Sequence, residues 1–183
     1  SWEMDKTKIF PVVLNKERNL ALVSSEDGIY REKLDLLILY YLKLDLLKGS
    51  FCSVRISKHF LEVWGVTEED LYRQCFQNRD YRLLKLADVN ILTNQPKYRG
   101  AAGMFFSDEV KKFAEKNDCD AFILPSSIHE TLLLKSDFGI SVRELKQIVR
   151  DINSDKDIMT EEDFLSDSIY LYNRNTDEIE IVG

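Results

Sequence analysis

The chain has 183 residues, a hydrophobic fraction of 44% and a formal net charge of −7. This length suits one domain, and the apolar content is sufficient for a buried core, which excludes a disordered chain. Because no apolar run reaches the roughly 20 residues of a membrane-spanning helix, we expect no membrane contact. The acidic charge is concentrated in residues 151–183, where ten acidic residues accompany only Lys156 and Arg174.

The cysteines Cys52, Cys75 and Cys119 are widely spaced and form no CxxC pair. Their odd number and their spacing match neither a disulfide framework nor a zinc site, and they fit a reducing, cytoplasmic environment. Since the chain begins at Ser1 rather than Met, we expect residues 1–183 to be a single α+β domain from the C-terminal part of a longer protein.

The first half of the chain predicts three strands and two capped helices. Apolar runs indicate strands at residues 9–14, 35–42 and 51–56, with Pro11 in an edge strand and a turn at residues 48–50. Asn15 is placed to cap a helix that reaches residue 23. Thr67, followed by acidic residues, is placed to cap a second helix that ends near residue 78.

The second half predicts strands at residues 89–93, 101–106, 169–172 and 178–182, with a strand, a kink and a second strand across residues 121–134. Helices are expected at residues 108–117 and from Ser141 to about residue 152, where Ser141 and Glu144 form a capping box. Residues 153–168 form an acidic connection. Short connections favour a mainly antiparallel sheet with three or four helices packed on one face.

A polar insert interrupts the apolar segment 121–134 and is the candidate functional site that the sequence indicates. It contains Pro125, Ser126, Ser127, His129 and Glu130. In a strand, Ser127 and His129 would share one face and Glu130 would point to the other. No Gly-x-Ser-x-Gly elbow supports a serine hydrolase, and the alternative is a kink whose hydroxyls satisfy freed backbone groups.

Three other patterns in the sequence suggest a site but also have a simpler interpretation. Residues 151–162 resemble an EF-hand loop, but Lys156 occupies the position that requires glycine, which favours a solvated acidic connection. Basic and aromatic residues between Tyr72 and Arg99 could bind nucleic acid, but a solvated helix and loop is the favoured interpretation. His59 and His129 match no zinc spacing, so we expect no metal and no cofactor.

Several segments resemble, in order, a bacterial protein family of unknown function. They are residues 11–15 with Arg18 and Asn19, residues 60–71 (FLEVWGVTEEDL), residues 91–94 followed by 100–102, residues 123–130 (ILPSSIHE) and residues 165–170. The resemblance implies a bacterial, intracellular protein whose relatives often carry further sequence before this domain. It transfers no catalytic residue. The family runs directly from the helix to the Leu165 turn, whereas this chain inserts residues 153–162.

Two functions from different classes follow. The first is a non-enzymatic binding or interaction module that uses the 123–134 strand pair to hold a protein or a small molecule. The second is a hydrolase in which His129 activates Ser126 or Ser127. In both, Glu130 completes the candidate site, and Trp64 and Asn94 are possible neighbours. The sequence leaves the oligomeric state and the partner open.

Overall fold

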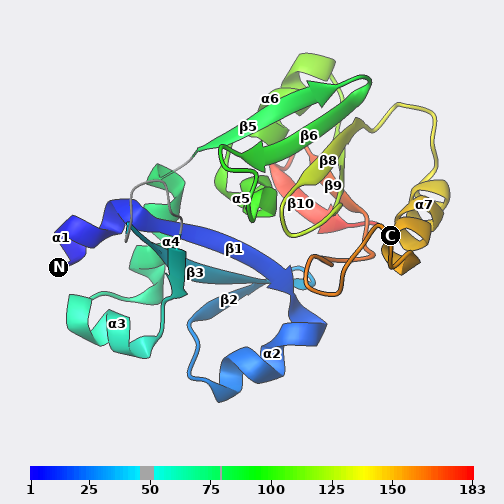
Figure 1. Cartoon of the computed structure of the whole chain (residues 1–183). Coiled ribbons are helices and arrows are strands. Elements are labelled where there is room, and N and C mark those ends of the chain that lie inside the picture. Colours follow the sequence, from blue (N-terminus) through cyan, green and yellow to red (C-terminus); the bar gives the residue numbers. More distant parts are fainter. Residues whose placement is uncertain (46–51, 79) are drawn as a thin grey trace. The chain divides into compact units, whose positions relative to one another are not determined.

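The computed structural model describes residues 1–45, 52–78 and 80–183. The chain divides into two compact units, residues 1–79 and residues 80–183. Each unit contains its own antiparallel sheet with helices against it (Figure 1). The chain therefore has the α+β, mainly antiparallel fold that the sequence predicts. That residues 1–183 fold as one domain stays a prediction.

Strand β3 (Leu36–Leu44) is the centre of the N-terminal sheet. It pairs along one edge with β1 (Ile9–Asn15) and along the other with β2 (Tyr30–Lys33) and β4 (Cys52–Arg55), always antiparallel. Pro11 lies in β1, an edge strand where a missing backbone N–H is tolerated, as predicted. The turn predicted at residues 48–50, and Phe51 of the predicted strand 51–56, lie outside the described residues.

The apolar run of β3 has no alternation because both of its faces are covered. Leu37 and Leu39 pack with Val23 of α2 (Lys16–Ser25). On the other face, the Tyr40 hydroxyl donates a hydrogen bond to Glu68 at the start of α4 (Glu68–Gln77). All five residues from Leu36 to Tyr40 are fully buried. A strand covered on both faces reads as a continuous apolar run, which explains the pattern in the sequence.

Side-chain caps fix where three of the longer helices begin, as the sequence predicts. The Asn15 side chain accepts the Arg18 N–H at the start of α2. Thr67 and Asp70 form a capping box at α4, and Ser141 and Glu144 form one at α7 (Val142–Ser154). The remaining helices of the N-terminal unit are short: α1 (Trp2–Asp5), η1 (Lys6–Lys8) and α3 (Lys58–Trp64).

A charged network joins α4 to the N-terminal sheet. The Arg31 guanidinium of β2 donates to both carboxylate oxygens of Glu68, at 3.0 and 2.6 Å, and also to Glu69 at 2.6 Å. It lies 3.6 Å from the centre of the Tyr72 ring. Burial, together with the hydrogen bond to Glu68, raises the pKa of the Tyr40 hydroxyl far above its usual range. Tyr40 is therefore a permanent donor to Glu68.

The C-terminal unit, residues 80–183, contains a sheet of six strands in the order β10-β9-β7-β8-β6-β5. Every neighbouring pair is antiparallel. The strands are β5 (Tyr81–Leu86), β6 (Val89–Asn94), β7 (Ala121–Leu124), β8 (Thr131–Lys135), β9 (Tyr170–Asn173) and β10 (Glu178–Ile181). The predicted strand pair across residues 121–134 is thus the central pair β7 and β8, and the predicted closing hairpin is β9 with β10.

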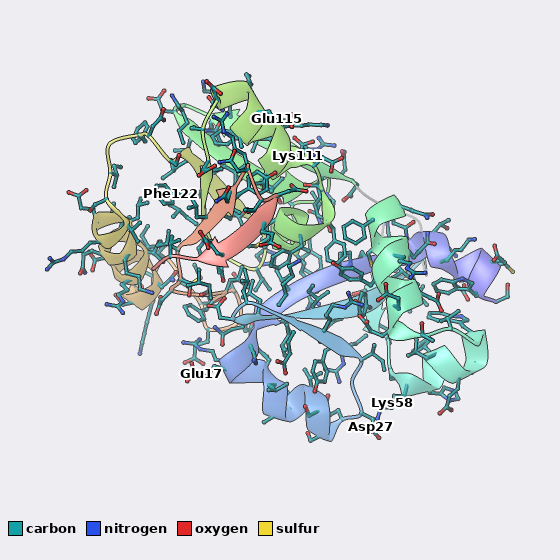
Figure 2. All side chains as sticks on the ribbon, turned by 180° about the vertical axis from the view of Figure 1, so that it is seen from behind. Glu17, Asp27, Lys58, Lys111, Glu115 and Phe122 are labelled. Carbon is teal, nitrogen blue, oxygen red and sulfur yellow. The ribbon has the colours of Figure 1, made fainter. Side chains whose placement is uncertain are left out.

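Helices cover both faces of this sheet, so the expectation of helices on one face was wrong. Phe122, labelled in Figure 2, packs with Leu145 and Val149 of α7. Alternation along β7 turns Ile123 to the opposite face, which α6 (Glu109–Asn117) covers through Val110, Phe113 and Ala114. None of the helices in the described part of the chain is long and apolar enough to cross a membrane.

The strand predicted at residues 101–106 was also wrong, because this segment is helical. Residues 100–102 form η2 (Gly100–Ala102) and residues 103–106 form α5 (Gly103–Phe106). Every residue from Gly100 to Phe106 is buried, so the apolar run carries no period that could separate a helix from a strand. A Cβ atom on Gly103 would lie 2.7 Å from the Tyr81 ring, which shows how closely α5 packs on β5.

We expect Glu68→Ala to lower the free energy of unfolding by about 2 kcal/mol, because it leaves Tyr40 and Arg31 without their shared acceptor. Both tryptophans, Trp2 and Trp64, lie in the N-terminal unit. Tryptophan fluorescence therefore reports that unit, whereas far-ultraviolet circular dichroism reports both. If the chain is a single domain, the urea unfolding transitions followed by fluorescence and by dichroism coincide in the wild type. Both then move to a lower urea concentration together in Glu68→Ala.

The matched control is Glu62→Ala, since Glu62 is exposed on α3 and makes no ion pair with the described residues. We expect it to leave both transitions in place. A Glu68→Ala protein whose fluorescence transition moves while a second dichroism transition stays would contradict the single-domain prediction.

Candidate functional site

The polar insert forms a tight loop between β7 and β8 in which the backbone turns back on itself. The Ser126 N–H donates to the Leu124 carbonyl at 2.9 Å, and the Ser127 N–H donates to the Glu130 carbonyl at 3.2 Å. The Ser127 hydroxyl accepts the backbone N–H of His129 at 3.0 Å. Ser127 therefore supports the loop, as serine side chains commonly do in turns.

A second loop, between β6 and η2, holds the insert from one side. The Thr93 hydroxyl donates to the His129 carbonyl at 2.8 Å, and the Ala101 N–H donates to the Ile128 carbonyl at 3.2 Å. Most importantly, the backbone N–H of Arg99 donates to the Nδ1 atom of His129 at 2.9 Å. The His129 side chain is thus a structural acceptor for a loop 30 residues away in sequence.

Asn94 shapes this second loop. Its Oδ1 atom accepts the Tyr98 N–H at 3.0 Å, and its Nδ2 atom donates to the Tyr98 carbonyl at 2.7 Å. Lys97 and Arg99 both have positive φ, at 55° and 56°, a conformation that is uncommon for residues other than glycine. The Asn94 amide therefore helps to hold the turn that presents the Arg99 N–H to His129.

Asp163 holds the insert from the other side. Its Oδ1 atom lies 3.0 Å from Nε2 of His129, and its carbonyl accepts the Ile128 N–H at 2.9 Å. Because Nδ1 accepts a hydrogen bond, the proton of the neutral ring belongs on Nε2, where it is donated to Asp163. The His129 side chain keeps 28% of its surface exposed.

The groups with unused hydrogen-bonding capacity lie next to this network. The Ser126 hydroxyl and the Glu130 carboxylate make no hydrogen bond with the described residues, and both residues are half-buried. The Tyr98 ring lies 5.6 Å from the His129 ring and 5.2 Å from the Arg99 guanidinium. The surface around His129 therefore combines a carboxylate, a hydroxyl, an aromatic ring and a cation.

This geometry does not make His129 a catalytic base for either serine. A general base needs a free lone pair directed at the hydroxyl that it deprotonates. The Nδ1 lone pair of His129 is engaged by the Arg99 N–H, and Nε2 is engaged by Asp163. The contact between Ser127 and His129 runs through the backbone N–H rather than through the ring. The hydrogen bonds of His129 instead stabilise the conformation of the loop between β7 and β8.

The remaining candidates from the sequence are not all in the unit that contains the insert. Trp64 belongs to the N-terminal unit, where its indole N–H donates to Asp5 at 3.0 Å, and its place beside the insert stays a prediction. The basic and aromatic residues between Tyr72 and Arg99 are divided between the two units. Within the described residues, no group of three or more His, Cys, Asp or Glu side chains could hold a metal ion.

The sequence does not reveal three partners of His129: Asp163, Arg99 and Thr93. Asp163 lies in the acidic connection, where nothing in the pattern distinguishes it from its exposed neighbours Glu161 and Glu162. Arg99 contributes through its backbone N–H, which no residue type reveals. Of the three, only Thr93 could be identified from the sequence, since it is a polar residue at the end of an apolar strand.

We expect Gly100→Ala to disrupt the site. A Cβ atom there would lie 2.5 Å from the Thr93 hydroxyl, 2.6 Å from the Asn94 nitrogen and 2.8 Å from the His129 carbonyl. The substitution should lower the free energy of unfolding by about 1–3 kcal/mol and shift the NMR signals of the His129 ring.

Gly139→Ala is the control, because Gly139 has a positive φ of 86° but open space around its Cβ position. This control should lose stability through backbone strain alone and leave the His129 ring signals unchanged. A folded Gly100→Ala protein with wild-type ring signals would show that the β6–η2 loop does not hold His129 as described.

A family of unknown function (DUF5688) matches residues 82–174, which is just over half of the chain. The match lies within the C-terminal unit and includes the insert, Arg99 and Asp163, whereas residues 11–19 and 60–71 fall outside it. The searches of curated proteins and of solved structures found no match. The chain therefore belongs to the DUF5688 family, whose function is unknown.

Proposed function

We propose that the chain is a non-enzymatic binding or interaction module, centred on the 123–134 strand pair, in the interior of a bacterial cell. The observation that carries this proposal is that both ring nitrogens of His129 are used to hold the insert. Most polar groups of the insert then stabilise the loop itself. The Ser126 hydroxyl and the Glu130 carboxylate remain available to bind a partner. The bacterial, intracellular setting is supported by the resemblance of the ILPSSIHE segment and by three free cysteines.

Preorganisation supports binding at this loop. Residues 125–130 are tied to β6, to η2 and to the turn at residues 160–164 by backbone and side-chain hydrogen bonds. A surface that is already ordered loses little conformational entropy when a partner binds. The Ser126 hydroxyl and the Glu130 carboxylate offer an acceptor-rich pair, so the complementary partner is a protein segment or a small molecule that donates hydrogen bonds.

The test is affinity capture from a lysate of a bacterium that encodes the protein, with three baits. The wild type and Lys111→Glu should retain the same partner, since Lys111 is exposed on α6 and lies outside the insert (Figure 2). A Ser126→Arg/Glu130→Arg double variant should lose it, because it replaces both available groups with cations. Recovery of the same set of proteins by all three baits would overturn the proposal for a protein partner.

The alternative is a hydrolase in which Ser126 or Ser127 is activated by His129. Ser126 is the better nucleophile candidate, because its hydroxyl is not used by the loop, whereas Ser127 accepts the His129 N–H. Activation would require His129 to give up one of its two partners. We therefore expect no reaction with a fluorophosphonate serine probe. Stoichiometric labelling that Ser126→Ala or Ser127→Ala abolishes would replace the binding proposal with the hydrolase.

A further inference from the structure

A groove of about 570 Å³ lies between α6 and the strands β5, β6 and β8 of the C-terminal unit, away from the insert. Four lysines line it: Lys85, Lys112, Lys116 and Lys135. The acidic residues of its lining are Asp88 and Glu109. The groove therefore carries a local excess of positive charge in a chain whose net charge is −7, which indicates a specific arrangement of charge on this face.

Much of this positive charge is not neutralised by the protein itself. Lys85 and Lys116 form no ion pair with the described residues. Lys112 lies 3.8 Å from Glu109, and Lys135 lies 3.7 Å from Asp137, which are long separations for ion pairs. Exposed pairs at such distances contribute little, so all four ammonium groups can still interact with an added anion.

The other part of the lining is apolar. It includes Leu83 of β5, Phe113 of α6 and Phe138, which follows β8. Phe138 keeps 58% of its surface exposed, which is unusual for a large aromatic side chain in a folded domain. An exposed aromatic ring beside a cationic rim is a surface that an apolar or aromatic group can cover.

We propose that this groove binds a small molecule that carries an anionic group on an apolar, aromatic body. The lysines would pair with the anion, and the body would pack on the exposed ring of Phe138. The volume lies in the range of about 300–1,000 Å³ that is typical of small-molecule sites. Every residue that lines the groove falls within the segment that the DUF5688 family matches.

The test uses two fluorescent probes with similar aromatic bodies, the anionic 8-anilinonaphthalene-1-sulfonate and the uncharged N-phenyl-1-naphthylamine. The folded wild type should bind the anionic probe saturably at one site and more tightly than the neutral probe, with an affinity that falls as salt is added. A Lys85→Gln/Lys116→Gln double variant should bind the anionic probe about tenfold more weakly and the neutral probe as before.

Lys111→Gln is the matched control, because Lys111 lies on α6 but does not line the groove; it should leave both affinities unchanged. Phe138→Ser should weaken the binding of both probes, since it removes the exposed ring, and its circular dichroism should show that it remains folded. The proposal is overturned if the wild type binds no anionic probe saturably, or if the double lysine variant binds it as tightly as Lys111→Gln does.

Discussion

The hydrogen bonds of His129 join three segments that are distant in sequence. Its ring accepts the Arg99 N–H on one side and contacts Asp163 on the other, and its carbonyl accepts the Thr93 hydroxyl. His129 therefore fixes three segments relative to one another: the insert between β7 and β8, the loop after β6 and the turn at residues 160–164. A half-buried imidazole can join two segments in this way, because it offers an acceptor and a donor on opposite sides of one rigid ring.

In the binding proposal, this use of His129 separates the residues that hold the loop from the residues that would contact a partner. The insert presents Ser126 and Glu130 on a loop whose conformation is already determined, while the lysine-lined groove lies on the α6 side of the same sheet. In the N-terminal unit, the Arg31–Glu68–Tyr40 network likewise ties α4 to the strands β2 and β3. In both units, hydrogen-bonded polar groups therefore connect elements that are distant in sequence.

Local signals in the sequence predict much of this fold. Asn15, Thr67 and Ser141 identify helix starts because capping depends on residues that are three positions apart. The segment 101–106 was wrongly predicted as a strand because burial on all sides removes the periodicity that separates helix from strand. At the site, the proximity of Ser127 and His129 follows from their spacing, but Asp163 is 34 residues from His129. Only the topology of the sheet brings that carboxylate to the ring.

The most direct measurement is the ¹⁵N NMR spectrum of the His129 ring at neutral pH, in the wild type and in Asp163→Ala. The structure predicts a proton on Nε2 and an acceptor at Nδ1 in both proteins, with the Nε2 signal alone shifting when the carboxylate is removed. A proton on Nδ1, or a ring that averages between the two tautomers, would contradict the account. In that case His129 would have a free lone pair, and the hydrolase would become the better explanation of the insert.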